Sequence, residues 1–391
     1  MPKNLSAAKE NDGAVRFSAL NSIMDLRLVA DLIIQEVENG EGKRKTYNDY
    51  AIIARSKTIV FPAAQSALAI NNIPFRLLGG DSVFESPEAK FITSFGSLVA
   101  FGSGAKRADK ESLVKWSSLL TDIGVSQDAA DGICARSRHD VDMGDGTTYG
   151  IDGIIIAIRE SRVKKENKES ALLLANTIKH LRSSRGVVFR NMLESEVVQR
   201  TVESLVSSRV EKYMMKRFKD KKMSLTIDEA KAAINKEINE RLEGFSIAMS
   251  AFADMSIQKA IASLELTAAD DGDEHMPKVT ISTAHSAKGL EWDTVFVGEA
   301  NSASWPSGMA KKMLTNCDDE LKNAVMDEER RLLYVAVTRA KERLYLMTTN
   351  NNAPSDFLPK YVIDQANEII EKSVAGNGSR GDNIKFEKKQ G

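Results

Sequence analysis

The chain has 391 residues, 42% of them hydrophobic and 28% charged, and its formal net charge is −1 at pH 7. This balance predicts a globular protein of about two or three domains, in which a basic groove can exist only as a local feature. Two distant cysteines, Cys134 and Cys317, and four histidines without metal-ligand spacing exclude a disulfide framework and a zinc knuckle. Without an apolar run of about 18 residues or a signal-peptide core, we expect a cytoplasmic protein that has no membrane partner and holds no metal by itself.

The first hundred residues alternate between strand-like and helix-like patterns. The run AIIA (51–54) is short and wholly apolar, which is typical of a strand buried on both faces of a parallel sheet. The expected strands are 14–20, 51–54 and 74–78, and the expected helices are 23–38, 61–71 and 87–100. Strand, helix and strand at this spacing predict βαβ units.

Between residues 105 and 265 the pattern changes to long amphipathic helices. Helical periodicity covers 168–183, 190–219 and 226–264, whereas residues 154–158 fit a strand or a helix. The acidic, glycine-containing stretch 268–277 has the composition of a hinge. We therefore expect a separate all-α domain here.

Strand-like runs return beyond this stretch, at 279–283, 294–298 and 344–348, with a helix expected over 327–341. The simplest interpretation is an α/β protein in which a parallel-sheet domain is interrupted by an all-α insertion. The expected boundaries are 1–100 and 276–372 for the α/β domain, 101–275 for the insertion and 373–391 for a flexible tail.

The segment STAHSAKGLEWDTVFV (282–297) joins two expected strands through a loop of small and polar residues. Such a loop at the carboxyl edge of a parallel sheet is where open α/β folds bind ligands. Lys288 can pair with a phosphate, the hydroxyl of Thr283 can donate to its oxygens, and Gly289 permits a turn that other residues resist. An ordinary surface loop is the alternative for this stretch alone.

The segment MDEERRLLYVAVTRAKERLYLM (326–347) predicts a helix with acidic residues early and basic residues late, as the helix dipole favours. Arg339 follows the run YVAV (334–337), a position where an arginine needs an anionic partner. The alternative is a snorkelling arginine or a surface ion pair.

In residues, order and spacing, these two segments resemble motifs V and VI of superfamily 1 DNA helicases of the UvrD/Rep/PcrA family. Segments 51–80, 84–90, 304–308 and 353–358 resemble further blocks of that family in the same order. The resemblance covers the two α/β segments and hardly extends into the helical middle. It implies a RecA-like motor domain with a helical insertion, in a 3′ to 5′ motor that uses ATP on single-stranded DNA.

Carried over to this sequence, the resemblance implies two sets of site residues. Arg339 would reach the γ-phosphate of ATP as an arginine finger, with Glu291 near the ribose and Gly289 in the same turn. The expected single-stranded DNA contacts are Thr283, His285, Lys288, Arg55, Ser56, Lys57 and Trp305. Trp305 would offer a stacking face for a base, or else cover the domain core.

The helical insertion of the family carries a Gly-Ile-Gly hairpin that grips duplex DNA. The corresponding stretch here is Asp122-Ile123-Gly124-Val125, in which the first glycine is missing and an acid stands beside it. The resemblance therefore implies duplex DNA as a partner, but this stretch departs from the pattern that binds it.

The chain contains no G-x-x-x-x-G-K-(S/T) loop and no D-E-x-Q pair. In the family these segments hold the phosphates and Mg²⁺, and they precede the block that resembles residues 51–80. ATP with Mg²⁺ would then need a P-loop-containing first motor domain, on another polypeptide or missing from a fragment. Two other functions stay open: a nucleic-acid-binding regulatory module without ATPase activity, and the helicase part of a recombination or defence complex with a nuclease.

Overall fold

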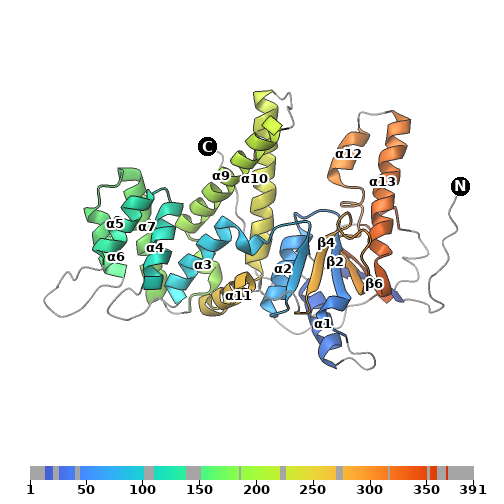
Figure 1. Ribbon diagram of the computed structural model, residues 1–391, viewed down its shortest axis with the longest axis horizontal. Helices are drawn as coiled ribbons and strands as arrows, with labels where there is room; N and C mark the ends of the chain where they lie inside the picture. Colours follow the sequence, from blue (N-terminus) through green and yellow to red (C-terminus); the bar gives the residue numbers. More distant parts are fainter. Residues whose placement is uncertain are drawn as a thin grey trace. The chain divides into compact units, whose positions relative to one another are not determined.

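The computed structural model describes residues 14–20, 26–39, 45–100, 110–137, 151–184, 186–220, 226–269, 276–315, 318–349, 353–358 and 367–368. These residues form two compact units (Figure 1). An α/β unit runs through Asp81 and resumes at Met276, and a helical unit begins at Ser82. No helix within the described ranges is long and apolar enough to cross a membrane.

A seven-stranded sheet in the order β3-β4-β2-β5-β6-β1-β7 forms the centre of the α/β unit, and its paired strands are parallel. The strands are β1 (Ala14–Leu20), β2 (Tyr50–Ala54), β3 (Phe75–Leu78), β4 (Val279–Thr283), β5 (Trp292–Val297), β6 (Ala340–Thr349) and β7 (Asn367–Glu368). The helices are α1 (Arg27–Asn39), α2 (Val60–Ile70), α12 (Gly308–Leu314) and α13 (Asp319–Val337). β2, β4 and β5 are buried along their whole length, as befits central strands covered on both faces.

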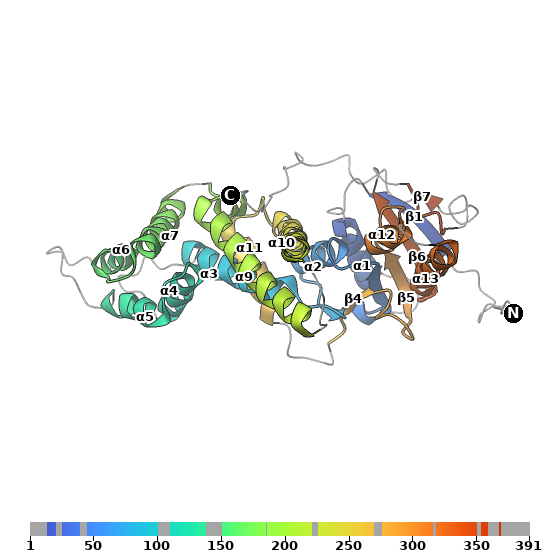
Figure 2. The same ribbon diagram turned by 90° about the horizontal axis from the view of Figure 1, so that it is seen from above.

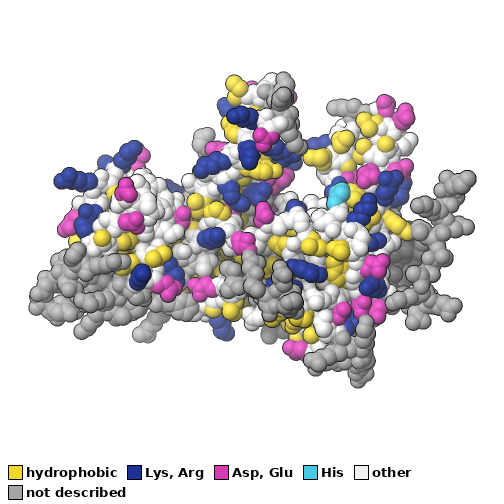
Figure 3. All heavy atoms as spheres, in the orientation of Figure 1, with side chains coloured by type: hydrophobic (Ala, Val, Ile, Leu, Met, Phe, Trp, Pro, Cys, Tyr) yellow, Lys and Arg dark blue, Asp and Glu magenta, His cyan; other side chains and the backbone are white. Residues whose placement is uncertain are grey.

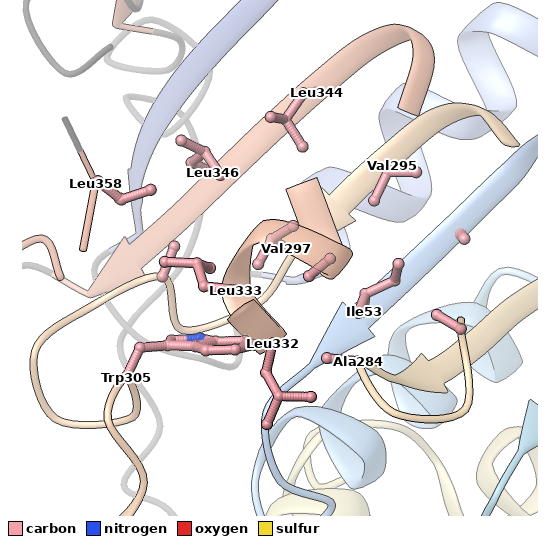
Figure 4. Close-up of a cluster of buried hydrophobic side chains, with 14 of the residues drawn as sticks. Ile53, Ala284, Val295, Val297, Trp305, Leu332, Leu333, Leu344, Leu346 and Leu358 are labelled. Carbon is pink, nitrogen blue, oxygen red and sulfur yellow. The ribbon is translucent and has the colours of Figure 1, made fainter. Parts of the chain in front are cut away.

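Helix α13 covers one face of this sheet. Its Leu332 and Leu333 belong to the same buried cluster as Ile53 of β2 and Val295 of β5 (Figure 4). The helix begins eight residues before the expected start at residue 327, because the Asp318 side chain accepts a hydrogen bond from the backbone N of Leu321 at 2.8 Å. This N-cap satisfies one of the free amides of the first turn.

The opposite face is held by aromatic and polar contacts. Phe296 of β5 and Tyr345 of β6 stack with their ring centroids 4.7 Å apart. Glu36 of α1 accepts a hydrogen bond from the Tyr50 hydroxyl at 2.8 Å and pairs with Arg343. Alternate residues of each strand therefore serve opposite faces, as strand geometry requires.

The helical unit contains nine described α-helices and the 3-10 turn Val83–Glu85. The helices are α3 (Pro87–Ala100), α4 (Lys110–Asp122), α5 (Gln127–Arg136), α6 (Ile151–Glu160), α7 (Lys165–Ser183), α8 (Phe189–Leu193), α9 (Glu196–Asp220), α10 (Ile227–Ser250) and α11 (Ile257–Ala269). In Figures 1 and 2, α6 lies beside α7 and α9 beside α10. Buried aromatic rings such as Phe84 and Phe252, 6.0 Å apart, form part of its core.

The sequence-based fold class is confirmed, while several boundaries differ. The boundary expected at residue 100 was wrong, because α3 packs against α4, α9 and α11 and belongs to the helical unit. Residues 154–158 are helical, and the two longest expected helices each divide into two. The expected hinge (268–277) lies mostly outside the described residues, and the expected tail (373–391) lies wholly outside them.

Candidate functional site

The carboxyl ends of β2 and β4 lie level with each other, since Ala54 and Thr283 are register partners. Residues 55–57 follow β2 at this edge. At the end of β3, Gly79 has a φ of 82°, and a Cβ on it would lie 2.2 Å from the Oγ of Ser286. The structure therefore brings together loops that follow three neighbouring strands, at the edge where open parallel sheets bind ligands.

Thr283 shapes the turn that follows β4. The residue is 8% exposed. Its hydroxyl donates to the Oγ of Ser286 at 3.0 Å and accepts from the backbone N of Ser286 at 3.2 Å. The expectation of a direct DNA contact through this hydroxyl needs correction, because the hydroxyl is used within the turn. Ser286, a polar residue of the same loop that was not among the expected DNA contacts, is the more accessible of the two.

Four expected contact residues face solvent in the segments that follow β2 and β4. Ser56, Lys57, His285 and Lys288 are all exposed, and neither lysine forms an ion pair with another described residue. Lysine and arginine side chains gather beside a histidine on the face of the α/β unit in Figure 3. Unpaired ammonium groups and free hydroxyls are the groups that bind a phosphate backbone.

Arg55, by contrast, forms an internal ion pair with Glu329. Its Nε donates to Oε2 of Glu329 at 2.9 Å, and its Nη2 lies 2.5 Å from Oε1 of the same carboxylate. The Nη2 also donates to the Oγ of Ser307 at 3.2 Å. The Arg55 side chain is 17% exposed and that of Glu329 6%. The expected role of Arg55 as a DNA contact is therefore corrected to that of an internal partner.

The environment of Glu329 has a consequence for stability at acid pH. Burial favours a higher pKa, but hydrogen bonds from Arg55 and Ser307 outweigh it and hold the pKa of Glu329 below its ordinary value of 4.5. A carboxyl whose pKa is lowered by folding stabilises the fold above its unfolded pKa, and this contribution disappears as pH falls through the folded pKa.

We expect Glu329→Gln to lower the free energy of unfolding by roughly 1–3 kcal/mol at pH 7, because Arg55 loses its charged acceptor. Thermal melts between pH 7 and pH 3 should show the difference from wild type shrinking as the pH falls below 4.5. Glu328→Gln, at the neighbouring exposed position that pairs with Arg331, is the control and should change little at any pH. A difference that stays constant with pH would contradict this account.

A second group of expected site residues lies at the amino ends of β5 and β6. The backbone N of Trp292 donates to the carbonyl of Arg339 at 2.9 Å, which joins the end of α13 to the start of β5. Gly289 and Glu291, just before β5, are exposed, and Gly289 adopts a φ of 87° that favours glycine. The three residues expected to serve the nucleotide therefore come from two segments that meet here.

The Arg339 guanidinium is held by neutral oxygens. Nε donates to the carbonyl of Val335 at 2.9 Å, Nη1 to the carbonyl of Leu290 at 3.0 Å and Nη2 to the Oγ1 of Thr338 at 3.1 Å. No carboxylate among the described residues pairs with it. The side chain is thus oriented without being neutralised, and its full charge stays available for an anion.

The two sites are separated along the strands. β5 has six residues, so its first and last residues lie about 17 Å apart. The segment 282–297 begins at the carboxyl edge with Thr283 and reaches the opposite end before Trp292. One motif therefore contributes to both sites, which its linear sequence does not reveal.

Trp305 lies in the core and offers no stacking face. It is 0% exposed and packs in the cluster that contains Leu332, Leu333 and Leu358 (Figure 4). Its carbonyl accepts a hydrogen bond from the Ser355 hydroxyl at 2.8 Å. The alternative of an aromatic covering the core therefore replaces the expected DNA contact.

In the helical unit, residues 122–125 comprise the last residue of α4 and the turn that follows it. Gly124 has a φ of 95°, and its carbonyl accepts a hydrogen bond from the Asn167 side chain at 2.6 Å. Burial raises the pKa of Asp122 to about 6. The hydrogen bond from Asn167 thus stabilises the end of α4. The Asp122 carboxyl stands at the position that corresponds to the duplex-gripping hairpin of the family.

The sequence model described as the UvrD-like helicase C-terminal domain matches residues 6–351. The chain belongs to this family. The ATP-dependent DNA helicase PcrA of Staphylococcus epidermidis is 24% identical over 375 residues, covering 91% of this chain and 45% of the relative. PcrA of Staphylococcus aureus is 25% identical over 398 residues, covering 97% of this chain and 47% of the relative. This UvrD-like chain therefore spans about half the length of these curated relatives, and the match includes the helical middle.

Sequence reasoning missed Glu329 and Ser307 in this UvrD-like chain. A signal was present, since Arg55 directly follows a wholly buried strand and needed an acidic partner. We expected an anionic partner for Arg339 as well, but no described residue supplies one. Nothing in the linear sequence shows which acid of the stretch 327–329 turns inward.

Proposed function

We propose that this chain is the C-terminal half of an ATP-dependent 3′ to 5′ DNA helicase. The observation that carries the proposal is Arg339, a guanidinium oriented by neutral oxygens beside the exposed Gly289 and Glu291. An arginine held in this way suits the charge of a transferring phosphoryl group, as an arginine finger does.

The rest of the nucleotide site would come from a first motor domain outside the chain. The present chain contains no P-loop sequence. Among the described residues, no group of three His, Cys, Asp or Glu side chains could hold a metal ion. The residues therefore suit one side of a triphosphate but do not suit Mg²⁺, and we assign the metal to the completing domain.

The loops that follow β2 and β4 would bind single-stranded DNA. Lys57 and Lys288 provide exposed positive charge, and Ser56 and Ser286 provide hydroxyl donors. Contacts to phosphate carry no sequence information, so binding should be independent of base sequence. ATP-driven closure of the nucleotide site would then move this track along one strand.

We expect single-stranded DNA binding by the chain to weaken steeply with salt. If about two or three phosphates are neutralised, the slope of log affinity against log salt should be roughly −1.4 to −2.1. Lys288→Ala should reduce the slope by roughly 0.7, the share of one phosphate. Fluorescence anisotropy with a labelled oligonucleotide at several salt concentrations measures it.

Lys341→Ala is a matched control, because Lys341 is exposed at the start of β6, outside the loops that follow β2 and β4. It should leave the slope unchanged. A salt-independent affinity, or equal losses from Lys288→Ala and Lys341→Ala, would argue against phosphate binding by the loops that follow β2 and β4.

A further inference from the structure

Glu329 occupies the centre of a buried junction between three segments of the α/β unit. The residue is 5% exposed. Its carboxylate accepts two hydrogen bonds from Arg55, one from the backbone N of Ser307 at 3.0 Å and one from the Ser307 hydroxyl at 3.0 Å. Four donors therefore fill the carboxylate, and they come from the loop after β2 and from the N-cap of α12.

The junction fixes geometry as well as charge. The two nitrogens of Arg55 that meet the carboxylate form a fork, which sets both the distance and the plane of the pair. The Ser307 hydroxyl also accepts from the backbone N of Ala310 at 3.2 Å, so the start of α12 is included. A junction with this many directed bonds has one favoured arrangement.

Two residues beyond Arg55 stands Lys57, which is exposed and forms no ion pair with a described residue. The backbone between them is short, so the position of Arg55 constrains where the Lys57 side chain can reach. Arg55 is neutralised by the junction while Lys57 is not. The loop therefore exposes the charge of Lys57 to solvent, while the charge of Arg55 is paired inside the protein.

We propose that Glu329 is a positioning residue for DNA binding: through Arg55 it holds the loop 55–57 so that Lys57 meets a phosphate of the single strand. The proposal rests on the proposed function. It adds that an acid on α13 fixes the position of Lys57, one of the lysines expected to contact phosphate. Glu329 itself touches no DNA in this account, and Arg55 contributes no phosphate contact of its own.

The test is a double-mutant cycle on the full chain, with the salt slope of oligonucleotide binding as the readout. Lys57→Ala should reduce the magnitude of the slope by roughly 0.7 in the wild-type background. Glu329→Gln should reduce it by a similar amount. Lys57→Ala added to Glu329→Gln should then change little, because the displaced loop no longer brings Lys57 to a phosphate. A role confined to stability would lower the melting temperature without this non-additivity.

Arg55→Lys provides a second variant that keeps the charge opposite Glu329 but lacks the planar fork. It should give the same non-additivity with Lys57→Ala while disturbing the fold less than Glu329→Gln. Equal effects of Lys57→Ala in all backgrounds would overturn the positioning role. A steeper slope in Glu329→Gln would also overturn it, since that would mean that released Arg55 binds phosphate. A flat slope in the wild type would instead remove the proposed function, and the inference with it.

Discussion

Arg339→Ala is expected to lower ATP turnover by about 10³-fold once the chain is joined to a first motor domain that supplies a phosphate-binding loop. Its guanidinium is bound only to neutral oxygens of Val335, Leu290 and Thr338 among the described residues, so its charge is free to stabilise a phosphoryl transition state. Steady-state ATPase assays in the presence of single-stranded DNA measure the effect.

Arg339→Lys should recover little of the lost turnover, because an ammonium cannot copy the planar fork. DNA affinity should stay close to that of the wild type, since Arg339 is not among the residues expected to contact DNA. Removing three hydrogen bonds to partly exposed oxygens should cost stability only modestly. A variant with a much lower melting temperature but normal turnover per folded molecule would show that Arg339 is a packing residue.

Trp305→Ala is expected to destabilise the α/β unit by about 3–5 kcal/mol, the usual cost of deleting a buried aromatic side chain. The indole is fully buried beside Leu332 and Leu333, so its removal leaves a cavity under α13. Thermal or denaturant unfolding of the full chain measures the loss.

Trp305→Phe keeps most of the buried volume and serves as the control, with a much smaller loss of stability. Oligonucleotide affinity per folded molecule should be unchanged in both variants. If Trp305 stacked on a base instead, alanine would cost about 1–3 kcal/mol of binding and leave the melting temperature nearly unchanged. The two measurements on one variant therefore separate a core role from a DNA contact.

The parallel-sheet architecture could be predicted because its signals are local. The wholly apolar run at 51–54 corresponds to β2, a strand buried at every position. Boundaries were harder to predict because they depend on packing between distant residues. Helix α3 follows β3 closely in sequence, yet it packs with helices of the other unit, including α9 and α11, which begin at Glu196 and Ile257.

The site residues divide in the same way. Exposure of Lys57 and Lys288 agrees with expectation, since a polar loop after a buried strand has little else to pack against. The roles of Arg55 and Trp305 depend on partners that no local pattern identifies. Arg55 pairs with Glu329, and Trp305 packs in the hydrophobic cluster under α13. An arginine and a tryptophan in segments expected to contact DNA can each serve the fold instead, and only their three-dimensional neighbours show which role they have.

The order of strands in the sheet also sets the order in which the chain can fold during synthesis. β2 is buried between β4 and β5, and both of these are made after the entire helical unit. At translation rates of about 5–20 residues per second, Ala54 would wait roughly 11–45 s for Val279 to emerge. The helical unit can complete its contacts, including those of α3 with α11, before Val279 emerges, while β2 has no partner on either edge. We therefore expect the nascent chain to bind a chaperone through this unpaired apolar strand before its last hundred or so residues are synthesised.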